Sequence, residues 1–238
     1  MKVRFRSAGD RALIVEFGDR VDRASSEQVL RLDTAVHSDP PIGIVETVPT
    51  FRSLAVYFDP LQTTRIELRQ AIRALLDRGD ARPREARFWR VPVCYEGDFA
   101  PDLVEVARLT GLAASEVVAL HAGTRYHVYM LGFLPGFPYM GDLPAPLALP
   151  RRADPRLRVP AGSISIATTL TAIYPYESPG GWHLIGATPI RMFDPERPEP
   201  ALFAPGDAIA FYAIDANEFA AIRQTATAAG SQTEGMLR

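Results

Sequence analysis

Residues 132–144, GFLPGFPYMGDLP, constrain the fold more than any other stretch, because glycine, proline and aromatic residues follow one another without a helical or strand period. Pro135 and Pro138 fix φ and remove two backbone donors, whereas Gly132 and Gly136 permit backbone angles that other residues avoid. We therefore predict a rigid, irregular loop. Because the loop is also apolar, the core, a partner chain or a ligand should cover it.

The first part of the chain alternates strand-like and helix-like segments. Residues 3–17 and 44–58 alternate apolar and polar side chains, which is typical of half-buried strands, and an amphipathic stripe follows each of them. The helix ends are predicted from capping residues, which are Ser25 or Ser26 for the first start, Thr63 or Thr64 for the second start and Gly79 for the second end. This order predicts a small α/β sandwich of ferredoxin-like character.

Residues 78–87 are charged, contain glycine and proline and lack apolar periodicity, which predicts a linker. Beyond the linker, strand-like runs are separated by turns. The predicted strands are residues 91–95, 126–131, 162–167, 173–174, 182–185, 190–193 and 208–212, and the predicted helices are residues 102–109, 115–121 and 217–226. Several short strands at such spacing favour a barrel over an open parallel sheet.

The sequence therefore predicts an α+β protein of two domains. The small N-terminal α/β domain is expected to span residues 1–85, and the β-barrel domain residues 86–225. Residues 226–238 are expected to form a frayed tail, because residues 230–238 are too polar and too rich in small side chains to pack well. The length of 238 residues exceeds the commonest domain size, which agrees with this division.

Composition argues against several function classes. A formal net charge of -2 leaves no electrostatic footprint for nucleic acid or for an anionic membrane. No run reaches the ~18 apolar residues of a membrane span, and the start lacks the pattern of a signal peptide, so a cytoplasmic protein is expected. Lys2 is the only lysine among 26 basic residues, and no phosphate-binding loop motif occurs. ATP-dependent chemistry would therefore need another chain to hold the nucleotide.

Four arginines fall within residues 149–163, next to prolines that stiffen the backbone. Guanidinium groups bind carboxylate or phosphate through paired hydrogen bonds, so one or two of these side chains can hold an anionic group. Arg158 is the first candidate, because it directly precedes the Val-Pro-Ala-Gly-Ser entry into a strand. The alternative is that all four are solvated or pair with nearby acids, as surface arginines usually are.

Residues 173–183 bring together groups that suit the stabilisation of an oxyanion. Tyr174 and Ser178 offer hydroxyls, a Gly-Gly pair exposes backbone amides, and His183 can transfer protons near neutral pH. The alternative is a tight turn followed by a core strand, with the neighbouring tryptophan as filler and His183 exposed.

No metal site is predicted. His121 and His127 flank a turn, but their spacing is not a recognised metal-binding pattern, and a structural or exposed role is favoured for both. Cys94, the single cysteine, excludes an internal disulfide. Because it lies in an apolar strand without a neighbouring base, it is interpreted as a core residue.

Three stretches taken together resemble one family. They are GFLPGFPYMGDLP, LPRRADPRLRVPAGSISIA and IYPYESPGGWHLIGATP, followed by MFDP and PGD near the last strands. In this order and spacing they resemble the family of the 5-oxoprolinase B subunit, also described as the KipI family and as allophanate hydrolase subunit 1. The similarity extends from the RSAGDRALIVEFG start to PGDAIAFYAI.

The resemblance implies that the barrel is cyclophilin-like. It also implies a shared, ATP-hydrolysing activity, in which a B subunit, inactive alone, opens 5-oxo-L-proline to L-glutamate beside a C subunit of related barrel fold and a separate A subunit. ATP would be bound with or by those partners. Three alternatives stay open: an inhibitor of a sensor histidine kinase, a carboxyltransferase-like component acting on urea- or allophanate-type amides, and a small-molecule-binding barrel without catalytic activity.

The resemblance also carries site residues over to this chain. With Arg158 and His183 as catalytic candidates, the substrate-binding candidates are Gly132, Phe133, Pro135, Gly136, Tyr139, Arg152, Pro160, Gly162, Tyr174, Ser178, Gly180, Gly181 and Trp182. Residues 167–175 depart from the family pattern Ala-Gly-x-Gln-Thr-Gly-Ile-Tyr-Pro. Leu170 replaces an amide, and Thr168 and Ala172 replace glycines, so a different ligand or a weakened activity is an alternative.

Overall fold

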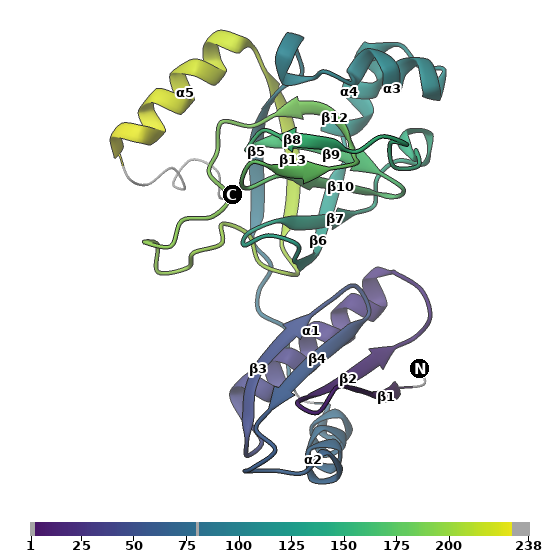
Figure 1. Ribbon diagram of the computed structural model, residues 1–238, viewed down its shortest axis with the longest axis vertical. Helices are drawn as coiled ribbons and strands as arrows, with labels where there is room; N and C mark the ends of the chain where they lie inside the picture. The colour runs from purple at the N-terminus through teal and green to yellow at the C-terminus, as the bar shows by residue number, and fades with distance from the viewer. Residues whose placement is uncertain (1–2, 80, 230–238) are drawn as a thin grey trace. The chain divides into compact units, whose positions relative to one another are not determined.

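The computed structural model describes residues 3–79 and 81–229. The chain divides into two compact units, Met1–Glu85 and Ala86–Arg238, and each is described by itself (Figure 1). No helix in the described ranges has the length and apolar content needed to cross a bilayer.

The first unit is an antiparallel four-stranded sheet with two helices. Its elements are β1 (Val3–Ala8), β2 (Ala12–Phe17), α1 (Arg23–Ser38), β3 (Ile44–Pro49), β4 (Ser53–Phe58) and α2 (Arg65–Arg78). The strand order is β1-β2-β4-β3. In a ferredoxin-like unit the last strand of the sequence lies at the edge of the sheet and pairs with the first strand. Here that edge position is occupied by β1, which comes at the start of the sequence and pairs with β2. The predicted ferredoxin-like character is confirmed, with this permutation.

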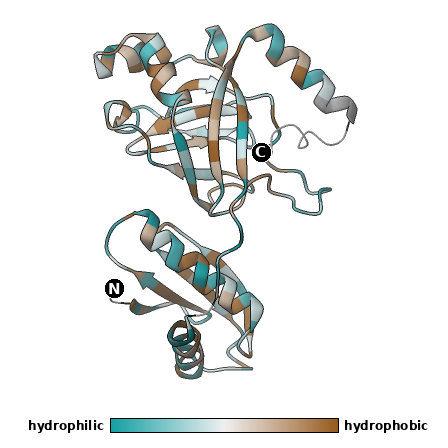
Figure 2. Ribbon diagram, turned by 180° about the vertical axis from the view of Figure 1, so that it is seen from behind, coloured by the Kyte–Doolittle hydropathy of each residue, from teal (hydrophilic) through white to brown (hydrophobic). Residues whose placement is uncertain are grey.

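Alternation along the strands places one apolar face of this sheet against both helices. The buried cluster includes Leu13, Val15, Phe17, Leu54, Val56 and Phe58 from the sheet, and Val29, Leu32, Val36, Leu68, Ile72 and Leu75 from the helices. Figure 2 shows that each helix of this unit carries both apolar (brown) and polar (teal) residues.

The helix ends test the capping predictions. The Thr64 hydroxyl accepts from the Glu67 N–H at 3.3 Å while Glu67 accepts from the Thr64 N–H at 2.8 Å, and Gly79 ends α2 in the left-handed region with φ 63°, as predicted. The predicted cap of α1 was wrong. Asp22 is the cap, and its carboxylate accepts from the Ser25 N–H at 2.7 Å, so Ser25 and Ser26 lie buried in the first turn instead.

The second unit is built on a closed seven-stranded barrel. Its strands are β5 (Phe88–Cys94), β6 (Arg125–Leu131), β7 (Pro138–Gly141), β9 (Ser163–Ala167), β10 (Leu170–Ile173), β12 (His183–Ala187) and β13 (Ala208–Ile214), in the order β10-β7-β6-β13-β5-β12-β9. A two-stranded ribbon of β8 (Arg156–Val159) and β11 (Ser178–Gly180) accompanies the barrel, with helices α3 (Leu103–Thr110), α4 (Ala114–Ala122) and α5 (Ala216–Ala229). The predicted barrel is confirmed, and it fits a cyclophilin-like fold.

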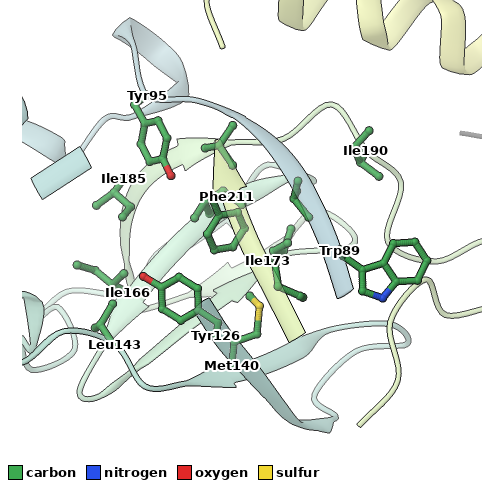
Figure 3. Close-up of a cluster of buried hydrophobic side chains, with 14 of the residues drawn as sticks. Trp89, Tyr95, Tyr126, Met140, Leu143, Ile166, Ile173, Ile185, Ile190 and Phe211 are labelled. Atoms are coloured by element: carbon green, nitrogen blue, oxygen red, sulfur yellow. The ribbon is translucent and has the colours of Figure 1, made fainter. Parts of the chain in front are cut away.

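The barrel interior is apolar and densely filled (Figure 3). Met140, Ile166, Ile173, Ile185 and Phe211 are among its buried side chains. Two of the polar side chains inside, Trp89 and His121, form hydrogen bonds. The indole N–H of Trp89 donates to Asp207 at 2.9 Å, and the ring of His121 lies between the Tyr95 hydroxyl at 2.8 Å and the Thr171 hydroxyl at 3.0 Å. His121 and Cys94 are therefore core residues, as favoured from sequence.

Three sequence predictions for this unit were wrong. Residues 138–141 of the predicted irregular loop form β7, which pairs with β6 and β10, because Pro138 stands at the first strand position, where a missing N–H is tolerated. Residues 190–193 form no strand; only an isolated bridge joins Phe193 to Ala201. The ribbon strands β8 and β11 were missed, since β11 contains Pro179 and Gly180, which indicated a turn, and prolines flank the short β8 on both sides.

The C-terminal helix is longer than predicted. It runs from Ala216 to Ala229, whereas the sequence predicted residues 217–226. The first residues of the predicted frayed tail, 226–229, continue this helix. The rest of that tail, residues 230–238, lies outside the described residues.

Candidate functional site

Four aromatic side chains pack together beside the loop at residues 132–137, and we call Phe137, Tyr139, Tyr174 and Trp182 the aromatic cluster. The Phe137 ring centroid lies 4.9 Å from Tyr139, 5.1 Å from Tyr174 and 6.4 Å from Trp182. Tyr139 and Trp182 are 6.0 Å apart. The predicted rigid apolar loop is thus covered in part by this chain's own residues.

The aromatic cluster lies on the outer side of the barrel wall. Along β10, Thr171 and Ile173 face the barrel core, whereas Leu170 and Ala172 face the cluster, as the period of two requires. Leu170, which stands where the family pattern has an amide, therefore contacts the cluster. Phe133 borders this apolar surface and is 62% exposed, with its ring centroid 5.4 Å from that of Phe137.

Two glycines allow close backbone approaches near the cluster, one to Tyr174 and one to Thr188. A Cβ on Gly180 would lie 2.2 Å from the Tyr174 hydroxyl oxygen, so only glycine fits beside this phenol. Gly162 has φ 84°, and a Cβ there would lie 2.4 Å from the Thr188 carbonyl oxygen. Its N–H donates to the Tyr174 carbonyl at 2.7 Å, which fixes the backbone directly after β10 that carries the phenol.

Both phenols of the cluster remain protonated at neutral pH. Burial raises the pKa of Tyr174 to about 12, with a further contribution from Tyr139, and burial also raises the pKa of Tyr139. A protonated phenol donates one hydrogen bond and accepts others. The cluster can therefore offer flat apolar surface together with hydroxyl donors, which suits a small cyclic amide.

Two of the four nearby arginines are bound by a buried carboxylate. Asp102, with a side chain 5% exposed, accepts from Arg152 at 3.0 Å, from both terminal nitrogens of Arg156 at 2.8 and 2.6 Å, and from the Leu184 N–H at 2.7 Å. Arg152 also donates its backbone N–H to the Gly181 carbonyl at 2.8 Å. These contacts anchor the segment before β8 to β12, and they leave Arg152 little freedom to bind a further anion.

Arg151 is the arginine that faces the aromatic cluster. Its guanidinium carbon lies 5.9 Å from the centroid of the Trp182 ring. Its charge lowers the pKa of Tyr139 and Tyr174, against the larger rise from burial. Within residues 3–79 and 81–229, Arg151 forms no ion pair. A cation above an aromatic surface, without an acidic partner in those ranges, suits the carboxylate of a small ligand.

The two catalytic candidates lie away from the aromatic cluster. The Arg158 side chain is 79% exposed and pairs with Glu177 at 2.8 Å. His183 is buried rather than exposed, and it pairs across strands with Ile166, which faces the barrel core. Its Nε2–H donates to the Pro150 carbonyl at 3.0 Å, which leaves Nδ1 buried and without a partner among the described residues.

The remaining candidates divide into two groups. Those in or beside the cluster are Gly132, Phe133, Gly136, Tyr139, Tyr174, Gly180, Gly181 and Trp182. Pro135 and Pro160 are exposed in loops, and the Ser178 hydroxyl is buried and has no hydrogen-bond partner within the described ranges. Gly162 also lines a pocket of about 470 Å³ whose walls include Tyr176, Pro189 and Phe193.

Sequence reasoning did not select Asp102 or Arg151. Asp102 has the sequence signature of a helix cap, but its carboxylate makes no capping bond and binds arginines 50 and 54 positions later. No local spacing predicts such a pairing. Arg151 belongs to the arginine-rich stretch at residues 149–163. It differs from the other arginines there because they have acidic partners, and the sequence does not show where those partners lie.

No residue in the described part of the chain is assigned to a metal or to a nucleotide. No group of three or more metal-ligating side chains occurs in the described part of the chain. For ATP, the sequence provides no phosphate-binding loop, and its single lysine, Lys2, lies outside the described residues. We therefore assign ATP binding to no residue of this chain.

Comparison with known proteins gives consistent matches. A family model described as carboxyltransferase domain, subdomain C and D, matches residues 3–203. Two relatives are named as B subunits of 5-oxoprolinase. The protein from Bacillus subtilis is 36% identical, with 94% of this chain and 99% of the relative covered, and that from Escherichia coli O157:H7 is 40% identical, with 85% and 92% covered.

A solved structure shares the fold. The crystal structure of TTHA0988 has a TM-score of 0.77 and 36% identity, and the match covers 86% of this chain and 40% of that one, so this chain spans less than half of that protein. The family resemblance predicted from the three motifs is thereby confirmed: the chain belongs to the family of 5-oxoprolinase B subunits, within the carboxyltransferase domains of the subdomain C and D type.

Proposed function

We propose that this chain is the B subunit of an ATP-dependent 5-oxoprolinase, which opens 5-oxo-L-proline to L-glutamate together with partner subunits. The observation that carries the proposal is the match over 99% of the length of a relative named as a 5-oxoprolinase B subunit. The word subunit implies an assembly, and a C subunit of related barrel fold and an A subunit are the proposed partners. ATP belongs with those partners.

The geometry supports a specific role for the aromatic cluster. 5-Oxoproline is a flat five-membered lactam that carries one carboxylate. Its ring suits the surface of Tyr139 and Trp182, its carboxylate suits Arg151, and its lactam oxygen suits a phenolic donor. Arg152 and Arg158, the carboxylate-binding candidates from sequence, are instead paired with Asp102 and Glu177. We therefore assign the carboxylate to Arg151.

His183 and the Gly180–Gly181 amides remain proposals for the step in which water adds to the amide carbon. The unpartnered Nδ1 of His183 is an acceptor that can take a proton. Its place on the barrel-core side of β12 means that a substrate on the outer wall would not reach it directly. Gly180 lies beside Tyr174, so its amide is the better placed donor.

The test is reconstitution from purified subunits. This chain, the two proposed partner subunits, 5-oxoproline and ATP should give glutamate at a rate that falls to background when this chain alone is omitted. The same mixture is assayed with urea and allophanate. Turnover of those amides without turnover of 5-oxoproline would overturn the proposal, as would full 5-oxoproline turnover in the absence of this chain.

A further inference from the structure

A second cavity lies in the first unit, far along the sequence from the aromatic cluster. It is a groove of about 600 Å³ between β1 and α2, which we call the arginine groove. Its apolar floor and cationic wall are formed by Phe5 and Leu13 from the sheet and by Arg65, Ile66, Arg69 and Arg73 from α2. Figure 1 shows α2 beside the edge of the sheet that carries β1 and β2.

The three helical arginines form one cationic row. They are spaced four residues apart, so they lie on one face of α2. Arg65 donates to the Gly9 carbonyl at 2.8 Å, and its Nε is buried without a partner among the described residues. The guanidinium carbons of Arg69 and Arg73 lie 5.1 and 5.5 Å from the centroid of Phe5.

This row has no acidic partner within the described ranges. Arg69 and Arg73 form no ion pair or hydrogen bond there, and no aspartate or glutamate lines the groove. Arg6, a further cation of the groove, is already paired with Glu16 at 2.7 Å. Two like charges held over one ring repel each other, and an anion placed between them would relieve that repulsion.

The neighbouring strand, β1, indicates what kind of ligand the groove can bind. β1 stands at the edge of the sheet, so alternate backbone N–H and C=O groups along it point away from β2. An extended peptide added there would place every second side chain toward α2, about 6.7 Å apart. Arginines four positions apart on a helix are about 6 Å apart along its axis, which matches this repeat.

We propose that the arginine groove binds an extended acidic segment of a partner protein, which pairs with β1 as an added strand. Two successive groove-facing side chains of the segment are acidic and meet Arg69 and Arg73, and the next groove-facing side chain is apolar and covers Phe5 and Leu13, while the side chains between them face solvent. This site is independent of the 5-oxoprolinase proposal.

The probe is a fluorescein-labelled peptide, Thr-Glu-Thr-Glu-Thr-Leu-Thr, in which the glutamates stand two positions apart and share one face of a strand with the leucine. Fluorescence anisotropy with the full chain measures its binding. The double variant R69Q/R73Q should bind at least about 10-fold more weakly, because two charge-assisted contacts are lost. The matched control R20Q/R82Q removes two exposed arginines outside the groove and should bind like the wild type.

Two further measurements separate strand addition from charge attraction alone. A peptide of the same composition with its glutamates adjacent should bind at least about 10-fold more weakly, since adjacent strand residues face opposite sides. Hydrogen exchange of residues 3–8 should slow when the first peptide binds. Equal binding of both peptides, unchanged exchange in β1, equal binding by R69Q/R73Q, or displacement by equimolar inorganic phosphate would overturn the proposal.

Discussion

Single residues in this chain show how backbone angle and side-chain neighbours decide a role. Thr168 occupies a position where the family pattern has glycine. Its backbone is in the left-handed region, at φ 54°, where a β-branched residue is strained. Phe133 is also left-handed, at φ 67°, and exposed. Arg151 and Arg158, seven positions apart, differ because Glu177 pairs with only one of them.

Replacing Thr168 by glycine should stabilise the barrel. Relief of the left-handed strain outweighs the extra flexibility of glycine in the unfolded chain, and a net gain of about 0.5 to 1 kcal/mol in the free energy of unfolding is expected. Denaturation followed by tryptophan fluorescence reports on this unit, because both tryptophans, Trp89 and Trp182, lie in it. The control T169G changes the neighbouring residue, which is not left-handed, and should destabilise. Destabilisation by T168G would contradict the account.

Whole elements could be predicted from sequence where their signals were local. The cap of Thr64 with Glu67, the stop at Gly79 and the strand at β13 follow from residues within a few positions of each other. Elements defined by distant partners could not. β7 is a strand because β6 and β10 flank it, and the ribbon of β8 and β11 pairs residues about twenty positions apart.

The candidate site follows the same division. The glycine and aromatic motifs identified most of the aromatic cluster, because close approach and ring contact need those residue types. The ion pairs of the charged residues could not be predicted. Asp102 decides which arginines are already bound, and it lies 50 positions from Arg152.

The barrel interior predicts a pH dependence of stability. Burial lowers the pKa of His121 to about 3, compared with about 6.5 when unfolded, so the unfolded chain binds the extra proton between these values. The contribution of His121 to the free energy of unfolding is fully present above pH 6.5. It decreases by about 1.4 kcal/mol per pH unit as the pH falls toward 3. H121Q should flatten the wild-type slope in this window.

The measurement is chemical denaturation, followed by tryptophan fluorescence, at several pH values from 4 to 7. The matched control is H127Q, which changes a half-buried histidine of β6 in the same barrel. Parallel wild-type and H121Q curves would show that His121 is not buried in its neutral form.

At the scale of the whole molecule, the two units present different kinds of binding surface. The barrel unit holds the aromatic cluster with Arg151 above Trp182, which suits a small cyclic amide with a carboxylate. The first unit holds the arginine groove, which suits a polypeptide. One surface for a substrate and another for a partner agree with an activity that is divided among several chains.

The most direct test of the substrate assignment is the kcat/KM for 5-oxoproline of the reconstituted complex with R151Q or R158Q in this chain. R151Q should lower kcat/KM by about 10- to 100-fold, which is the loss expected when hydrogen bonds to a charged group are removed. R158Q should lower it by less than about twofold. Inhibition by 2-pyrrolidinone, which lacks the carboxylate, should be unchanged in R151Q. Equal losses in both variants, or weaker inhibition by 2-pyrrolidinone in R151Q, would contradict the assignment of the carboxylate to Arg151.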